Sequence, residues 1–392
     1  MEKYRIKTLN RLAQEGLSLF GNDFSVGEQV EEPDGIIVRS SQVDTSQFSG
    51  LLAVARAGAG VNNITVDQAT EQGICVFNTP GANANAVAEL VFVMLGICAR
   101  NILQGADFCK GLWELEDHEI GRQVEARKGA FKGFELAGRT LGVIGLGQIG
   151  VRVANGGTTR NMRVIGFDPY PALGNIHSLS SEVVLSRSMT EVLNQADIIS
   201  IHVPLSDKTR GIINSSLIER MRPGTILVNH ARGPVVDEDA VLAGLESGKL
   251  LNYITDFPSQ RLIRHPAVIC SPHLGASTEE SEEQCACMAV KELKDYLEYG
   301  TISHSVNFPT TESIPASNVH SRLIMINRDI PGMIGFASQV IGSHGINIAS
   351  YINESNGKVG YNIIDLEQEA SPEVLAKIGD NPDVIRTRVI RL

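Results

Sequence analysis

The sequence lacks a hydrophobic run long enough to cross a membrane. No stretch of about 18 apolar residues occurs, so no membrane-spanning helix is expected. The opening residues, MEKYRIKTLNRLAQEG, also lack the apolar centre of a signal peptide. We therefore expect a cytoplasmic protein with no membrane partner.

Cysteine is scarce, and the six cysteines are scattered at positions 75, 98, 109, 270, 285 and 287. They form no metal-binding pattern, because Cys285-x-Cys287 is too short and has no second pair. Reduced and mostly buried thiols are expected, with no metal site.

Positive charge is also in deficit, with 34 Lys and Arg against 45 Asp and Glu, a net charge of −11. This excess of negative charge argues against nucleic acid as a partner. A few local arginines can still hold a small anionic substrate.

Length and composition favour several globular domains. The chain has 392 residues, of which 43% are hydrophobic and 20% charged, and it has 38 glycines against 15 prolines. Such a chain exceeds the usual size of one domain. Its glycine content suits a fold with many tight turns between strands and helices.

Short apolar segments alternate with helical ones through most of the chain. The nearly all-apolar segment 84–99 predicts a buried helix. Strict alternation of strand and helix predicts a doubly wound parallel sheet. The predicted strands are 35–38, 51–55, 75–77, 141–144, 163–167, 198–203, 225–229 and 268–270.

The C-terminal segment has a different order. An amphipathic helix over 285–299 leads to a Ser-, Thr-, Pro- and Asn-rich linker at 303–318. From Arg322 the order is strand, helix, strand, strand, helix, strand, with a hairpin formed by 347–353 and 358–365. This order is typical of a ferredoxin-like fold.

A glycine motif, Gly145-x-Gly147-x-x-Gly150, follows the apolar strand 141–144 and opens a helix. In this context the three glycines allow a tight turn, close approach of a pyrophosphate and close packing of the helix. Asp168 ends the next strand, where a carboxylate binds ribose hydroxyls and repels a 2′-phosphate. The motif therefore predicts NAD rather than NADP.

Two side chains near the ends of later strands suit hydride removal from a 2-hydroxy acid. His273 can take the hydroxyl proton near neutral pH. Arg232 has a guanidinium that matches the substrate carboxylate. In a doubly wound sheet, ligands bind just outside these strand ends.

Seven stretches together resemble the D-isomer-specific 2-hydroxyacid dehydrogenases, and most of all their phosphoglycerate dehydrogenase members. They are ARAGAGVNNI (55–64), NTPGANANAVAEL (78–90), LAGRTLGVIGLGQIG (136–150), GFDPY (166–170), HVPL (202–205), NHARGPVVDE (229–238) and SPHLGAST (271–278).

The resemblance implies a fold in which a Rossmann-type doubly wound parallel sheet is inserted in a flavodoxin-like substrate domain, followed by a ferredoxin-like ACT domain. The implied limits are 1–97 and 288–308 for the substrate domain, 98–287 for the NAD-binding domain, 309–321 for a linker and 322–392 for the ACT-like domain.

The resemblance also assigns site residues. The catalytic Arg and acid/base His fall on Arg232 and His273. Cofactor contacts fall on the glycine motif, with Gln148 and Ile149, and on Thr79, Asp168, His202, Val203, Pro204, Ala231 and, across a one-residue gap, Asp256.

The implied activity is oxidation of D-3-phosphoglycerate to 3-phosphohydroxypyruvate with NAD, the first step of L-serine biosynthesis. Other D-2-hydroxy acids (glycerate, 2-hydroxyglutarate) and a non-catalytic NAD-sensing scaffold remain as alternatives. Candidate substrate-binding residues lie in two segments, Arg39 with Ser40, and Arg56 with Gly60, Val61 and Asn62.

The ACT-like domain implies a serine effector at Asn327, Asp329 and Asn347. Asn327 and Asp329 stand where relatives commonly carry His and Asn. A dimerisation module without a ligand is therefore the alternative. The resemblance further implies a homodimer or homotetramer.

One departure concerns Gln260, which stands where the family normally has a Glu that pairs with the catalytic His. A Gln can orient the imidazole by hydrogen bonding but supplies no negative charge. Glu282 and Glu283 are candidate substitutes from elsewhere in the chain.

Replacing Gln260 with Glu should therefore move the acid limb of the kcat/KM pH profile to higher pH. Oxidation needs the neutral imidazole, and a neighbouring carboxylate keeps the ring protonated to higher pH. Gln260→Leu serves as the uncharged control. An acid limb that stays in place in Gln260→Glu would contradict this role.

Overall fold

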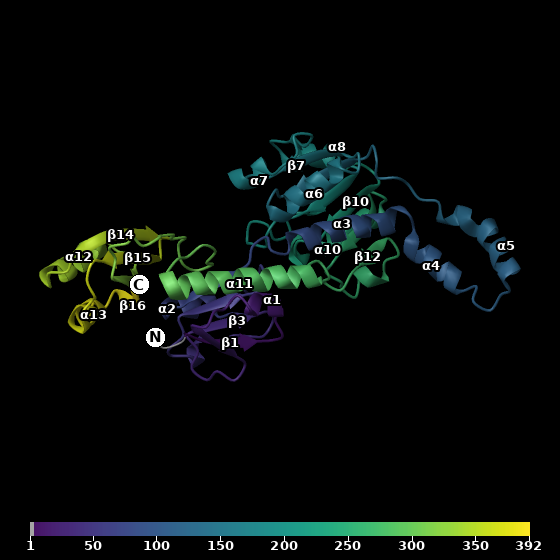
Figure 1. Cartoon of the computed structure of the whole chain (residues 1–392). Helices are drawn as coiled ribbons and strands as arrows, with labels where there is room; N and C mark the ends of the chain where they lie inside the picture. The colour runs from purple at the N-terminus through teal and green to yellow at the C-terminus, as the bar shows by residue number, and fades with distance from the viewer. Residues whose placement is uncertain (1–3) are drawn as a thin grey trace. The chain divides into compact units, whose positions relative to one another are not determined.

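The computed structural model describes residues 4–392, and contacts divide the chain into two compact units. The first combines the chain up to Asn83 with Glu279–Leu392, and the second is Ala84–Thr278 (Figure 1). The chain therefore leaves the first unit, forms the second and returns, as expected for an inserted domain.

The N-terminal part of the first unit is a five-stranded parallel sheet in the order β2-β1-β3-β4-β5. This is the flavodoxin-like order, so the predicted fold of this part is confirmed. Its strands are β1 (Tyr4–Leu9), β2 (Phe24–Gly27), β3 (Gly35–Val38), β4 (Ala53–Arg56) and β5 (Cys75–Asn78), and its helices are α1 (Gln14–Leu17), α2 (Val66–Glu71) and the long α11 (Glu279–Tyr299).

Helix α11 returns across this sheet and packs closely on α1. A Cβ added to Gly16 would lie 2.6 Å from the Cβ of Ala286, so only glycine allows this approach. The buried face of α11, including Ala289, Leu293 and Leu297, shares a core with Ile6 and other strand residues.

The second unit contains a seven-stranded parallel sheet in the order β12-β11-β10-β9-β6-β7-β8. The order reverses at β6, so β6 and β9 flank the point where ligands bind in doubly wound sheets. The strands are β6 (Thr140–Ile144), β7 (Arg163–Phe167), β8 (Val184–Leu185), β9 (Ile198–Ile201), β10 (Thr225–Asn229), β11 (Leu250–Thr255) and β12 (Val268–Cys270).

Helices cover this sheet, and α3 is the most deeply buried of them. Its residues Val91 and Leu95 share a core with Val153 of α6 and Leu141 of β6. These contacts place α3 in the second unit, so this unit begins earlier than the predicted limit at 98. The covering helices are α3 (Ala84–Ala99), α6 (Gln148–Thr158), α7 (Leu173–His177), α8 (Met189–Gln195), α9 (Ser215–Ile218) and α10 (Glu238–Glu246).

Two further helices of the second unit, α4 (Ile102–Lys110) and α5 (Asp117–Arg127), extend away from its sheet (Figure 1). Neither of these two described helices has a buried residue. The sequence patterns did not predict this arm, whose apolar residues Ile102 and Leu103 are exposed.

The C-terminal part is an antiparallel sheet in the order β14-β15-β13-β16, which confirms the ferredoxin-like prediction. The predicted hairpin is present, because β14 pairs antiparallel with β15. The elements are β13 (Ser321–Arg328), α12 (Met333–Ser343), β14 (Ile348–Ser355), β15 (Val359–Leu366), α13 (Pro372–Gly379) and β16 (Val384–Arg391).

This C-terminal sheet shares a core with the rest of the first unit. Ile324 and Tyr361 pack in one cluster with Tyr296 and Leu297 of α11. The buried guanidinium of Arg322 also donates to the carbonyl of Tyr299, 2.7 Å away. These contacts explain why the division keeps the C-terminal sheet with the first unit, although the sequence predicts a separate domain.

In the described part of the chain, no single helix has both the length and the apolar character needed to span a membrane. Only α3 and α4 taken as a pair meet that test, and they are bent by 62°.

Candidate active site

The glycine loop after β6 has the conformation that a dinucleotide-binding turn requires. Gly145 has φ = 90°, and a Cβ there would lie 2.6 Å from the carbonyl oxygen of His202. A Cβ on Gly150 would lie 1.9 Å from the carbonyl oxygen of Gly145. By contrast, a Cβ on Gly147 would meet nothing within 4 Å, so open space lies over the N-terminus of α6. This cradle fits a pyrophosphate.

Asp168 ties the end of β7 to the glycine loop. Its Oδ2 accepts the backbone N–H of Leu146 at 2.8 Å, and its Oδ1 accepts that of Tyr170 at 2.8 Å. The carboxylate is thus fixed beside the loop, as expected for a ribose-binding group. In the first turn of α6, the Gln148 amide donates to Oδ1 of Asn175 at 2.7 Å, and Ile149 is half-buried.

Two histidines follow neighbouring strands at the same edge of the sheet. Nε2 of His202, after β9, lies 2.8 Å from the Ser200 hydroxyl. Burial, and then the charge of His230, lower the pKa of His202 to about 3, so its ring is neutral at neutral pH. His230, after β10, is 5% exposed, and neither ring nitrogen has a hydrogen-bond partner among the described residues.

Unpartnered buried nitrogens are costly, so a polar ligand group at this edge would stabilise them. Sequence reasoning did not single out His230, although its position directly before Ala231 was a signal. Burial lowers the pKa of His230, and the nearby negative charge of Asp256 opposes that shift.

Arg232 lies on the turn that follows β10. The buried Asn229 holds this turn, because its Oδ1 accepts the Ala231 N–H at 3.1 Å and its Nδ2 donates to the Arg232 carbonyl at 3.0 Å. The Arg232 side chain is exposed, with Nη1 donating to the Ala231 carbonyl at 2.7 Å. Asn229 is a positioning residue that the sequence pattern did not reveal.

His273 lies on the loop after β12, in an unusual backbone conformation. Its φ is 56°, a left-handed value that is uncommon for a residue other than glycine. Its N–H lies 3.1 Å from the Asp256 carbonyl and 3.0 Å from the Ser271 carbonyl. Strained backbone of this kind persists where surrounding contacts hold it, and it is concentrated at functional sites.

Phe257 connects the two candidate catalytic residues. Its ring meets the His273 ring edge-on at 5.1 Å. A Cβ on Gly233, next to Arg232, would lie 3.2 Å from the Phe257 Cβ. The turn with Arg232 and the loop with His273 are therefore packed against one aromatic side chain.

The carboxylate of Asp256 is a hub for the His273 loop. It is 1% exposed; Oδ1 accepts the Ser271 hydroxyl at 2.5 Å and the Leu274 N–H at 2.9 Å, and Oδ2 accepts the Gly275 N–H at 2.7 Å. The resemblance implies a cofactor contact for Asp256, and in the structure its carboxylate holds the loop that carries His273.

Gln260 is exposed, and within residues 4–392 no hydrogen bond joins its side chain to His273. Glu282, one of the two carboxylates considered as a substitute, forms an ion pair with Arg39 in the first unit.

The substrate candidates of the first unit lie in two loops that are tied together. Asn10 Oδ1 accepts the backbone N–H groups of Arg39, Ser40 and Ser41. Arg56 joins this loop to the next, because Nε donates to the Arg39 carbonyl at 3.0 Å and Nη1 donates to the Gly60 carbonyl. Arg56 therefore acts as a brace between the loops.

The second of these loops is fixed from β5 as well. Nδ2 of Asn78 donates to the Ala59 carbonyl at 2.6 Å, and the N–H of the buried Thr79 donates to the Gly58 carbonyl at 3.2 Å. Val61 is half-buried and Asn62 exposed. Val203 is half-buried and Pro204 follows it in the second unit.

The effector candidates are partly engaged within the C-terminal sheet. The buried Asn327 donates to the Arg328 carbonyl and accepts from Asn362, each at 2.7 Å. Asp329 accepts the Ser355 hydroxyl at 2.5 Å. Asn347 is exposed.

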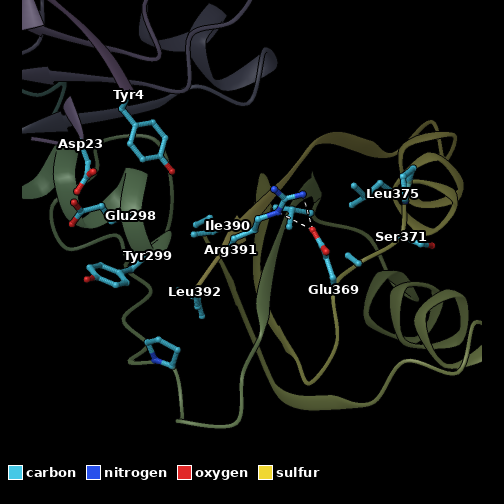
Figure 2. A pocket seen from close by; sticks show the side chains of 14 residues that line it. Tyr4, Asp23, Glu298, Tyr299, Glu369, Ser371, Leu375, Ile390, Arg391 and Leu392 are labelled. Carbon is cyan, nitrogen blue, oxygen red and sulfur yellow. Dashed lines mark hydrogen bonds and ion pairs between the residues drawn. The ribbon is translucent and has the colours of Figure 1, made fainter. Parts of the chain in front are cut away.

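A cavity of about 1200 Å³ lies elsewhere in the first unit, between α11 and the C-terminal sheet (Figure 2). Tyr4, Tyr299 and Ser371 contribute to its lining, and Arg391 forms an ion pair with Glu369 beside it at 2.7 Å. None of the residues lining it is a candidate catalytic or cofactor residue. No group of three or more His, Cys, Asp and Glu side chains in the described chain could hold a metal ion.

Comparisons with known proteins identify relatives of this chain. Residues 97–275 match the model of the D-isomer specific 2-hydroxyacid dehydrogenase, NAD binding domain. The chain is 32% identical over 326 residues to D-3-phosphoglycerate dehydrogenase of Bacillus subtilis, covering 78% of this chain and 59% of that relative. It is 34% identical over 319 residues to hydroxypyruvate reductase of Thermotoga maritima, covering 75% and 98%.

A solved structure of NAD+-bound 3-phosphoglycerate dehydrogenase from Entamoeba histolytica is similar, with a TM-score of 0.62 and 26% identity. The match covers 78% of this chain and 99% of that one. The chain spans little more than half the length of several curated relatives, with 59% and 53% for two of them.

Asp256→Asn should disorganise the His273 loop. An amide has one acceptor oxygen, and its NH₂ group would face an N–H or O–H donor, so a buried group loses its partner at a cost of about 1–3 kcal/mol. We expect the free energy of unfolding to fall by that amount and kcat to fall at least tenfold. Urea unfolding and steady-state kinetics measure both.

Ser271→Ala is the matched control, because it removes one donor and leaves the carboxylate. It should cost about 0.5–1.5 kcal/mol and lower kcat less. Equal kcat values for Asp256→Asn and wild type would rule out the positioning role.

Proposed function

The chain belongs to the D-isomer specific 2-hydroxyacid dehydrogenases, and we propose that it oxidises D-3-phosphoglycerate to 3-phosphohydroxypyruvate with NAD. One observation carries this proposal. The glycine loop, the Arg232 turn and the His273 loop all follow parallel strands of one sheet, whose carboxyl ends meet at the same edge.

The glycine loop and Asp168 would hold NAD, which accepts the hydride from C2 of the substrate. Arg232 binds the substrate carboxylate through its guanidinium and orients C2. The imidazole of His273 takes the hydroxyl proton as the carbonyl forms and returns it in the reverse direction. Asp256 keeps His273 in place, and the neutral His202 takes no part in proton transfer.

Arg39 is the proposed ligand for the substrate phosphate, and the loop with Gly60, Val61 and Asn62 is proposed to bind the substrate through its N–H groups. Arg56 supports both loops. Another D-2-hydroxy acid, such as glycerate, remains the second candidate, and the relative named hydroxypyruvate reductase supports keeping it.

A homodimer or homotetramer is the proposed assembly. The arm formed by α4 and α5 exposes Ile102, Leu103 and Trp113, the last with 79% of its surface exposed. Burial of these side chains between protomers would remove their apolar surface from water. A serine effector at the C-terminal sheet and a role in L-serine biosynthesis belong to the same proposal. A cytoplasmic location is consistent with six free cysteines.

The test is NADH absorbance with D-3-phosphoglycerate, D-glycerate and D-2-hydroxyglutarate. We expect the highest kcat/KM with D-3-phosphoglycerate and NAD.

His273→Ala should lower kcat at least a hundredfold with little change in KM, since acid–base catalysis contributes about 10²–10⁴-fold. Arg232→Lys should raise KM and lower kcat, because lysine lacks the guanidinium fork.

Lys249→Ala is the control variant and should keep wild-type rates. Lys249 directly precedes β11, at the amino ends of the strands and thus at the opposite edge of the sheet from the site. No NADH with any hydroxy acid, together with tight NAD binding, would favour the non-catalytic scaffold.

A further inference from the structure

Arg39, the proposed phosphate ligand, already has an anionic partner. Its Nη2 lies 2.6 Å from Oε1 of Glu282, and each side chain is 40% exposed. Arg39 follows β3, and Glu282 lies in the first turn of α11. Both belong to the first unit, so this ion pair is internal to it.

The surroundings place this ion pair beside the proposed substrate loops. Arg56 donates to the Arg39 carbonyl and to the Gly60 carbonyl. Cys285 lies three residues after Glu282 in α11. Burial raises the pKa of the Cys285 thiol, while the positive charges of Arg39 and Arg56 act in the opposite direction. The Arg56 guanidinium thus bonds to both loops, and the Arg39 guanidinium pairs with the first turn of α11.

A phosphate at Arg39 would compete with the Glu282 carboxylate. The two anions repel each other, and the guanidinium fork binds one of them well at a time. Exposed ion pairs are weak, so a phosphate can displace the carboxylate, at a cost in affinity. An unphosphorylated hydroxy acid places no charge there and meets no such competition.

We infer that Glu282 is a specificity-determining residue, which weakens binding of phosphorylated substrates by occupying Arg39. The inference rests on the proposed function and narrows its substrate class. The preference between phosphorylated and unphosphorylated hydroxy acids would then depend on the Glu282 carboxylate, which is not one of the proposed catalytic residues.

A simpler role for Glu282 is to stabilise α11, because acidic side chains favour the first turn of a helix. Glu279 and Glu280 lie in the same turn. Glu280→Gln is therefore the matched control, since it removes the same charge at an exposed position of that turn.

The experiment compares Glu282→Gln with Glu280→Gln and wild type, using D-3-phosphoglycerate and D-glycerate. In Glu282→Gln we expect KM for D-3-phosphoglycerate to fall about two- to fivefold, the range that corresponds to loss of an exposed ion pair. KM for D-glycerate should change less than twofold, and Glu280→Gln should change neither.

Isothermal titration calorimetry with the same two ligands and NADH-bound protein repeats the comparison without turnover. If the wild-type protein oxidises neither ligand, the proposed function is wrong. The ratio of the two Kd values, compared between wild type and Glu282→Gln, still decides the inference. Arg39→Ala completes a double-mutant cycle, and Glu282→Gln should have no effect on phosphoglycerate affinity in that background.

Glu282→Asp, which retracts the carboxylate by one methylene, provides a second variant if thermal unfolding shows that Glu282→Gln folds poorly. It should shift the phosphoglycerate affinity in the same direction. Equal changes for both ligands, or an unchanged phosphoglycerate affinity, would overturn the inference.

Discussion

The buried carboxylate of Asp256 is the constraint on which the proposed catalytic arrangement depends. It follows β11 and accepts three donors from the loop that carries His273. A buried carboxylate is stable only when such donors surround it, so the loop and the carboxylate fix each other. The left-handed backbone of His273 is held by the same segment, through bonds to the Asp256 and Ser271 carbonyls.

The same principle organises the rest of the site. Asn229 fixes the Arg232 turn, Asp168 fixes the glycine loop, and Asn10 fixes the Arg39 loop, each through bonds to backbone groups. Arg232 and His273, by contrast, stay exposed on these fixed loops. Rigid support beneath exposed side chains is what preorganised catalysis requires.

Local patterns predicted much of the fold. Short-range spacing identified the glycine motif and Asp168. The apolar pattern predicted strands at 163–167, 225–229 and 268–270, and the structure has strands with these bounds. The arm of α4 and α5 was missed, because a local pattern does not tell whether an apolar residue such as Leu103 is buried or exposed. The ion pair of Arg39 with Glu282 joins residues distant in sequence, and no local pattern encodes such a contact.

The C-terminal sheet shows a further limit of sequence reasoning, because its order was predictable but its attachment was not. The buried Arg322 pairs with Asp365 at 2.6 Å and donates to Tyr299 of α11. Arg388 donates to the Tyr296 carbonyl at 2.6 Å. These contacts attach the C-terminal sheet to α11, the helix that carries Glu282.

Transfer of the hydride from C2 of the substrate to NAD can be measured directly. D-3-phosphoglycerate deuterated at C2 is incubated with the enzyme and NAD, and the NADH is analysed by mass spectrometry. We predict one deuterium in each NADH formed, because the hydride leaves C2 as His273 takes the hydroxyl proton. NADH without deuterium, or no NADH from a protein that binds both ligands, would contradict it.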